Sequence, residues 1–174
     1  WYLRSMPSKI ATLLGMRTTE IDDIIYAVSY VVTEVSPEIE GLEDGLVVGN
    51  VITAQQEAKF YREYPFKYKV LTGAEAIRYL LRQINLKEEI DNLYEILKNA
   101  KKQDREKAIK RLDICEAFYK SNNKPEWMVM DVIPVIPPDL RPMTVLDGGR
   151  RTTSDLDELY KKIIQRNTRL RGLL

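Results

Sequence analysis

The sequence predicts an α+β fold in which helices dominate, and three observations support this. Apolar residues recur at helical spacing over much of residues 72–118. Residues 28–35 are rich in β-branched and aromatic types, which predicts a strand, and the apolar run 46–52 predicts a partner strand in a small sheet. Hydrophobic residues make up 44% of the 174 residues and charged residues 30%, a balance typical of folded proteins.

Two short helices are predicted before the first strand. Pro7 and Ser8 precede apolar residues at helical spacing, and Gly15 should end that helix, because glycine adopts a left-handed cap without a Cβ clash. Thr18 and Thr19 are candidate caps for a second helix that carries three isoleucines. The acidic residues that follow the first strand are interspersed with turn-forming types and predict a loop.

The middle of the chain is predicted to be helical. Residues 53–64 can form a surface helix that ends before Pro65, and residues 72–84 carry apolar side chains at the spacing of one helix face. Two further apolar stripes, within 86–97 and 108–118, lie on either side of a polar stretch. Two stripes that flank a polar turn predict an antiparallel helical hairpin.

The last third of the chain has a different character. Residues 128–136 form a β-branched run interrupted by proline, which lacks an N–H for a sheet, so the run is predicted to be extended at a sheet edge or in a loop. Residues 139–153 contain two adjacent glycines, Gly148 and Gly149, and show no periodicity, which predicts a long loop of the kind that is often functional. Ser154 is a candidate cap for a final helix.

This final helix holds the only strongly basic stretch of the chain. Its last fifteen residues include five cations and no acid. Lys162, Arg166 and Arg169 lie at positions i, i+4 and i+7 and so project from one side. A solvated helix face is the ordinary interpretation of such a row, and binding of phosphates or of an acidic partner is the alternative. The preceding loop adds three guanidinium groups suited to phosphate contact, those of Arg141, Arg150 and Arg151.

The composition excludes several kinds of catalytic site, and also an internal disulfide and a typical zinc site. The chain has no histidine and one cysteine, Cys115, so histidine acid–base catalysis, a Cys–His nucleophile, an internal disulfide and a typical zinc site are excluded. Neither a P-loop nor a G-x-G-x-x-G motif is present. Cys115 is interpreted as a small buried hydrophobe and the paired carboxylates as solvated. Trp127, beside Pro125, is interpreted as a packing anchor rather than a base-stacking residue.

Net charge and hydropathy limit which partners and which cellular compartment the sequence predicts. The formal net charge is +1, from 27 basic and 26 acidic residues, so any affinity for nucleic acid must be local. No apolar run reaches eighteen residues and no secretory signal is present, which predicts a soluble protein of a reducing, intracellular compartment. The chain begins at Trp1 and ends within a helical pattern, so we expect it to be a piece of a longer protein.

Several motifs resemble those of one known family. The second half contains NKPEWM at 123–128, VIPVIPPDLRP at 132–142 and LDGGR at 146–150, and the first half contains SYVV at 29–32 and GAEAI at 73–77. Together they closely resemble the β′ subunits of bacterial-type DNA-directed RNA polymerases. The resemblance covers nearly the whole chain and is weakest between Glu34 and Tyr68.

The resemblance implies that the chain is a fragment of the polymerase clamp with four parts. These are a lobe with a small sheet and a helical hairpin (1–121), an extended proline-rich segment (122–138), a lid loop (139–153) and the first arm of the clamp coiled coil (154–174). In the family, the lid lies at the upstream end of the RNA–DNA hybrid and helps to separate the transcript. Arg141, Arg150 and Arg151 are thereby implied to contact nucleic acid.

The coiled-coil arm implies a docking site for other proteins. In the family, this arm binds sigma factor and elongation factors, and Arg166 stands at a position that the family uses for sigma contact. The residues around it complete the candidate docking set, namely Lys162, Gln165, Asn167 and Arg169. The other implied partners are the β, α and ω subunits, the DNA template and the RNA transcript, with no membrane and with a cytoplasmic location at the nucleoid. The family's catalytic Mg and structural Zn are held outside the matching region, so no cofactor and no catalytic residue are expected in this chain.

Three departures from the family and one alternative function stay open. Arg151 stands where the family usually has an aromatic residue, Thr152 where it has a small one, and Asp157 where it often has asparagine. An arginine at position 151 either strengthens nucleic-acid contact or changes how the loop packs. The alternative function is a free-standing helical interaction module with a basic docking helix, and the apolar face of the last helix argues against it, because such a face requires a second helix.

Overall fold

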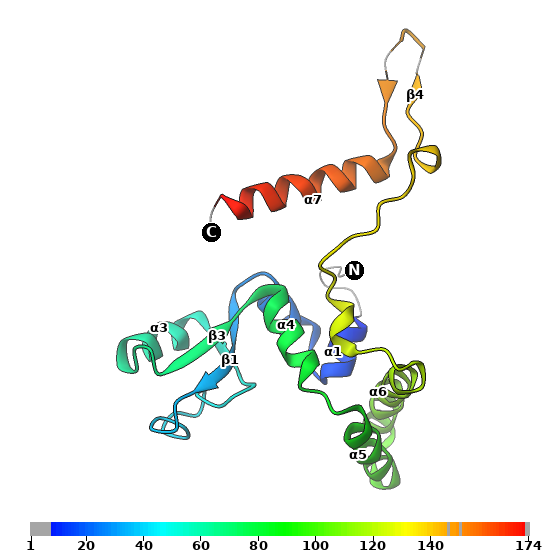
Figure 1. Ribbon diagram of the computed structural model, residues 1–174. Coiled ribbons are helices and arrows are strands. Elements are labelled where there is room, and N and C mark those ends of the chain that lie inside the picture. The colour runs from blue at the N-terminus through cyan, green and yellow to red at the C-terminus, as the bar shows by residue number, and fades with distance from the viewer. Residues whose placement is uncertain (1–7, 146, 150, 173–174) are drawn as a thin grey trace. The chain divides into compact units, whose positions relative to one another are not determined.

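The computed structural model describes residues 8–145, 147–149 and 151–172. It confirms an α+β fold with helices dominant, and the chain divides after Met130 into two compact units. The division falls inside the predicted extended segment 122–138, and the predicted four-part organisation of the chain stays a prediction. Figure 1 shows both units, each of which is described by itself below.

Unit 1 contains most of the helices and a small sheet. Its helices are α1 (Lys9–Leu14), α2 (Thr18–Ile25), α3 (Ala54–Glu63), α4 (Gly73–Arg82), α5 (Leu86–Asn99), α6 (Lys102–Ser121) and the 3₁₀ helix η1 (Pro125–Met128). Its strands are β1 (Ser29–Val35), β2 (Val51–Thr53) and β3 (Tyr68–Leu71).

The caps of the first two helices follow from their sequences in different ways. The Ser8 hydroxyl accepts a hydrogen bond from the N–H of Ile10 at 3.2 Å, and Gly15 ends α1 with φ 69°, as predicted. The predicted threonine cap of α2 is wrong. Its cap is Arg17, whose backbone N–H donates to the Glu20 carboxylate at 2.8 Å, because Glu20 stands at the third helical position, from which a side chain can reach back.

The three strands form one antiparallel sheet in the order β2-β1-β3. The pairing of β1 with β2 was predicted, but β2 is shorter than the run 46–52, since Gly49 adopts φ 90° and turns the chain just before it. Strand β3 was not predicted. It pairs with the other edge of β1, where Val32 lies opposite Val70.

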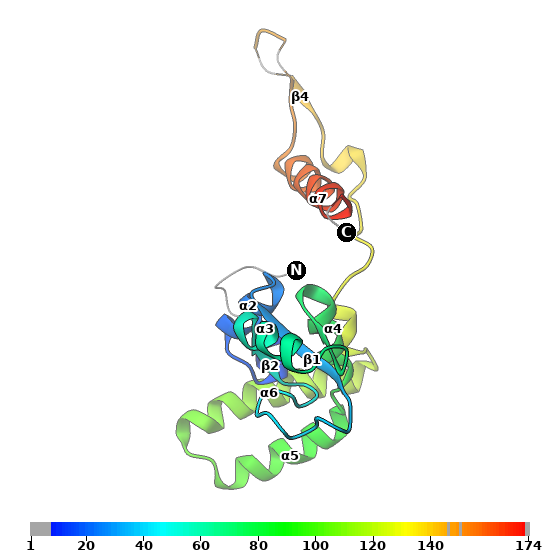
Figure 2. The ribbon, with the colours of Figure 1, turned by 90° about the vertical axis from the view of Figure 1, so that its left-hand side faces the viewer.

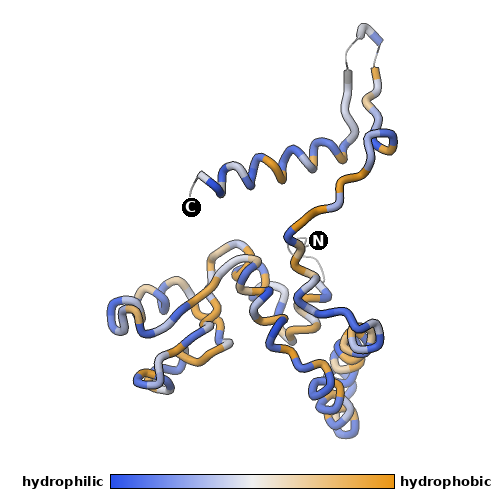
Figure 3. Tube along the Cα trace, viewed as in Figure 1, coloured by the Kyte–Doolittle hydropathy of each residue, from blue (hydrophilic) through white to orange (hydrophobic). Residues whose placement is uncertain are grey.

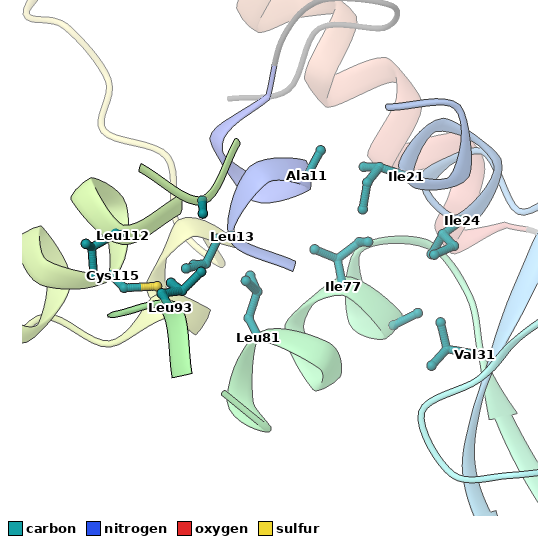
Figure 4. Packing of buried hydrophobic residues seen from close by; sticks show 12 residues of the cluster. Ala11, Leu13, Ile21, Ile24, Val31, Ile77, Leu81, Leu93, Leu112 and Cys115 are labelled. Atoms are coloured by element: carbon teal, nitrogen blue, oxygen red, sulfur yellow. The ribbon is translucent and has the colours of Figure 1, made fainter. Parts of the chain in front are cut away.

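The predicted helical hairpin is present as α5 and α6, which run antiparallel in Figure 2. Their buried residues Leu93, Leu112 and Cys115 meet Leu13 of α1 and Leu81 of α4 (Figure 4). Burial of each large apolar side chain contributes about 1.5–3 kcal/mol, so this cluster is the main source of stability in unit 1. A second cluster packs the sheet against α3 through Val32, Ile39, Leu46, Ile52 and Phe60.

Unit 2 begins with an extended chain and ends with a long helix. Its elements are the 3₁₀ helix η2 (Pro138–Leu140), the strands β4 (Thr144–Val145) and β5 (Arg151–Thr152), and the helix α7 (Asp155–Arg171). The predicted loop 139–153 therefore contains a short antiparallel ribbon, in which Thr144 pairs with Thr152. Apart from Arg151 and Leu170, whose side chains are not described, no described residue of this unit is buried.

Candidate nucleic-acid and partner-binding site

The predicted docking residues lie together on the described part of α7. Lys162, Gln165, Arg166, Asn167 and Arg169 are all exposed. Lys162 pairs with Glu158 at 3.3 Å, one turn earlier on the helix, whereas Arg166 and Arg169 form no ion pair with any other described residue. Figure 3 shows that α7 is mostly hydrophilic, with hydrophobic residues recurring along it. The helix thus presents two unpaired guanidinium groups to solvent.

The apolar residues of α7 are also accessible. Leu156 is 36% exposed, Leu159 42% and Ile164 64%, and Ile163 is half-buried. Apolar side chains at this spacing are the signature of a helix that packs against another helix. The described part of unit 2 supplies no such helix.

The ribbon has the geometry of a tight turn between two short strands. Gly148 and Gly149 adopt φ of 94° and 77°, conformations that favour glycine, and a Cβ built on either would meet nothing within 4 Å. Arg151 is paired with Val145 through the β-ribbon. The side chain of Arg151 and the whole of Arg150 lie outside the described residues, so their predicted phosphate contacts remain predictions.

Arg141 does not point freely into solvent. Its Nε donates to the carbonyl of Ile136 at 2.7 Å, its Nη1 pairs with the Asp157 carboxylate, and its guanidinium carbon lies 5.7 Å from the centre of the Tyr160 ring. The Tyr160 hydroxyl in turn accepts from the N–H of Ile136 at 3.1 Å and donates to the carbonyl of Pro134 at 3.4 Å. The predicted phosphate contact of Arg141 stays a prediction, and two faces of the guanidinium, at Nε and Nη1, already bind acceptors within the unit.

Asp157 and Tyr160 were not among the predicted site residues. The sequence singled out Asp157 only as a departure from the family that it resembles. The candidate cap Ser154 does cap the helix, accepting from the N–H of Leu156 at 3.3 Å. The available signal was the residue type at position 157, because a carboxylate there can give Arg141 a charged partner.

Two other sequence interpretations concern unit 1. Cys115 is fully buried, as predicted, and loss of solvation raises the pKa of its thiol above the ordinary value. The interpretation of Trp127 as a packing anchor is wrong within this chain, because its side chain is 59% exposed on η1. Its neighbour Pro125 is the buried residue of that turn instead.

The described residues do not fit a metal site. No group of three or more His, Cys, Asp or Glu among them is arranged to hold an ion, and the chain's single thiol is buried. No described helix combines the length and the apolar character that crossing a membrane requires. The surface features that unit 2 does present are a cationic helix face and a glycine-tipped ribbon.

Comparison with known proteins assigns the family. Residues 6–174 match the family described as RNA polymerase Rpb1, domain 1. The chain is 47% identical over 171 residues to the DNA-directed RNA polymerase subunit beta' of Acholeplasma laidlawii, 45% over 174 residues to that of Limosilactobacillus fermentum, and 46% over 176 residues to that of Aster yellows witches'-broom phytoplasma. These alignments cover 98%, 100% and 98% of this chain.

The chain spans only 12%, 14% and 12% of the length of these three relatives. Nearly every residue of the chain is nevertheless included in each match, and every match names the same polymerase subunit. The chain belongs to the β′ subunit family of DNA-directed RNA polymerases.

Proposed function

We propose that this chain is a binding segment of the polymerase β′ subunit, in which the ribbon contacts the RNA–DNA hybrid and helps to displace the transcript, while α7 docks sigma and elongation factors. The observation that carries the proposal is the exposed face of α7, where Arg166 and Arg169 form no ion pair with any other described residue. A rigid row of cations on a helix offers a partner both charge complementarity and a fixed register.

The ribbon supports the nucleic-acid part of the proposal. Two glycines at its tip allow a close approach of the backbone, and Arg150 and Arg151 directly follow them in sequence. Arginines at such a position add affinity for phosphates that does not depend on base sequence and that falls with salt. The ribbon thereby suits contact with a nucleic-acid backbone.

The setting of this function follows from the family. We place the chain in an assembled enzyme with the β, α and ω subunits, acting on a DNA template and an RNA transcript in the cytoplasm at the nucleoid. The chain contributes no catalytic residue in this proposal, and the enzyme's Mg and Zn are held by other parts of the subunit. The match to β′ subunits along almost the whole chain favours this function over a free-standing interaction module.

The docking role is tested by sigma-factor binding to the assembled polymerase carrying Arg166→Ala. Loss of one guanidinium from a charged docking face should weaken binding by about fivefold, the equivalent of about 1 kcal/mol, and less at high salt because the charges are screened. The matched control is Lys161→Ala, which removes an exposed cation that lies about 140° from Arg166 around the helix, at about 100° per residue.

Comparison of the two variants distinguishes docking on this face of α7 from no docking there. Weaker binding with Arg166→Ala and unchanged binding with Lys161→Ala supports docking on this face. Equal binding by the wild type and both variants, at low and at high salt, would reject the proposed docking role of α7.

A further inference from the structure

The most covered side chains of unit 2 form a polar cluster. Six residues of this unit are half-buried, and the others whose side chains are described are exposed. Four of the six, Ile136, Arg141, Asp157 and Tyr160, are joined by the contacts described above. We call Arg141, Asp157 and Tyr160 the clasp. In a unit without a buried apolar core, these contacts are the main tertiary interactions of the described residues.

The clasp lies at the open end of the ribbon. Arg141 precedes the first residue of β4 by three positions, and Asp157 follows the last residue of β5 by five. The clasp therefore joins the chain that enters the ribbon to the first turns of the helix that leaves it. Side-chain exposure of 24% for Arg141 and 21% for Asp157 keeps solvent from fully screening their ion pair.

The hydrogen bonds of the clasp restrict its geometry. The planar guanidinium is fixed by two acceptors at once, the Ile136 carbonyl through Nε and the Asp157 carboxylate through Nη1. Tyr160 closes the arrangement, because its hydroxyl bonds to both Ile136 and Pro134 while its ring lies near the guanidinium. Free rotation of the ribbon base about the start of α7 would break several of these contacts together.

We infer that Arg141 is a positioning residue that acts through Asp157 and Tyr160 to hold the ribbon in a fixed direction relative to α7. This inference rests on the proposed function of the two elements and adds that they behave as one rigid body. A partner that binds the cationic face of α7 would then constrain the ribbon as well. Arg141 contributes to nucleic-acid contact through the position of the ribbon, not through a phosphate bond of its own.

The direct test is a distance measurement between two spin labels, one at the ribbon tip (Asp147→Cys) and one on α7 (Lys161→Cys), in the full chain with Cys115→Ala. We expect one narrow distance distribution. Arg141→Asp alone and Asp157→Arg alone should each abolish the narrow peak, and the two together should restore it, because the reversed charges pair again. Glu158→Ala, which breaks the exposed ion pair with Lys162 on the same helix, is the control and should leave the peak unchanged.

A broad distribution in the unsubstituted pair, or a narrow one that survives both single charge reversals, would overturn the clasp.

A second measurement separates positioning from direct contact. In the assembled polymerase, a photoreactive residue at position 147 should crosslink to the transcript, lose crosslinking with Arg141→Asp, and regain it with the double reversal. Failure of the double reversal to regain it, despite a restored distance, would assign Arg141 to phosphate contact and overturn the inference. Absence of crosslinking in the unsubstituted enzyme would instead reject the proposed contact of the ribbon, and the distance measurement would still decide the clasp.

Discussion

Cys115 shows how burial determines the chemistry of a single side chain. The thiol lies in the core of unit 1, in one cluster with apolar residues of α1, α4 and α5, and Leu13 and Leu93 lie near it (Figure 4). Burial removes the water that would stabilise a thiolate, so the pKa of Cys115 is raised, although Arg111 opposes this shift. A buried neutral thiol is a poor nucleophile, and the role of Cys115 is to fill space.

The raised pKa of Cys115 predicts a pH-dependent stability. In the unfolded chain the thiol ionises at its ordinary pKa, whereas in the folded chain it stays neutral to higher pH. Its stabilising contribution is therefore complete below the ordinary pKa and is lost as pH rises through the raised value. Cys115→Ala should lower the free energy of unfolding by about 1 kcal/mol near neutral pH, and by less at about pH 10. Urea unfolding at both pH values measures this, and a constant difference would contradict the prediction.

At the scale of elements, Arg111 joins three helices of unit 1. It lies on α6, its Nε donates to the Leu13 carbonyl at the end of α1 at 3.0 Å, and its Nη2 pairs with Glu89 of α5 at 2.9 Å. Gly15 makes room for this guanidinium, since a Cβ there would lie 3.2 Å from Nη1. The last backbone groups of α1 are thereby connected to the hairpin.

Arg111→Lys tests this connection. A lysine keeps the charge but cannot present two separate N–H donors in the same fork, so either the Leu13 carbonyl or Glu89 loses its partner. We expect the free energy of unfolding to fall by about 1–2 kcal/mol in urea titrations. Lys110→Ala, on the neighbouring exposed position of α6, should change it by less than about 0.5 kcal/mol. An Arg111→Lys variant as stable as the wild type would show that the ion pair and the carbonyl contact contribute little.

The elements that could be predicted from the sequence are those whose signal is local and long. The hairpin of α5 and α6 was predicted because each helix repeats its apolar stripe over several turns. Strand β3 has four residues of which only alternate ones are half-buried, so it shows little periodicity of its own and depends on pairing with β1. The ribbon was missed for the same reason, since its strands have two residues each.

The candidate site was predictable to a similar extent. Helical spacing placed Lys162, Arg166 and Arg169 on one exposed face, because 3.6 residues per turn is a local rule. The engagement of Arg141 by Asp157 joins residues sixteen positions apart through the fold of the ribbon. Spacing along the chain carries no information about such a contact, so Arg141 was read from its residue type alone.

For the whole molecule, the two units differ in how they are stabilised. Both apolar clusters lie in unit 1, where they bury side chains from each of its helices α1 to α6. Unit 2 buries none of the side chains that the structure describes in it, and apolar side chains such as Val132, Leu140 and Ile164 are largely exposed. Its helix α7 has 17 residues, close to the length at which an isolated helix is only marginally stable in water.

Unit 1 should therefore unfold cooperatively while α7 loses structure gradually and at lower temperature. A cooperative transition requires a shared apolar core, and the described part of unit 2 has only the clasp and the ribbon to hold its helix. Hydrogen exchange followed by mass spectrometry measures both units in one sample. We expect amide protection in α4, α5 and α6 to approach the global free energy of unfolding, and protection in α7 to be weak.

Docking of a partner on α7 should raise the amide protection of this helix selectively, because binding to the folded helix stabilises it by mass action. Equal protection of α7 and α6 in the free chain would contradict this account and would show that unit 2 is stabilised without a partner.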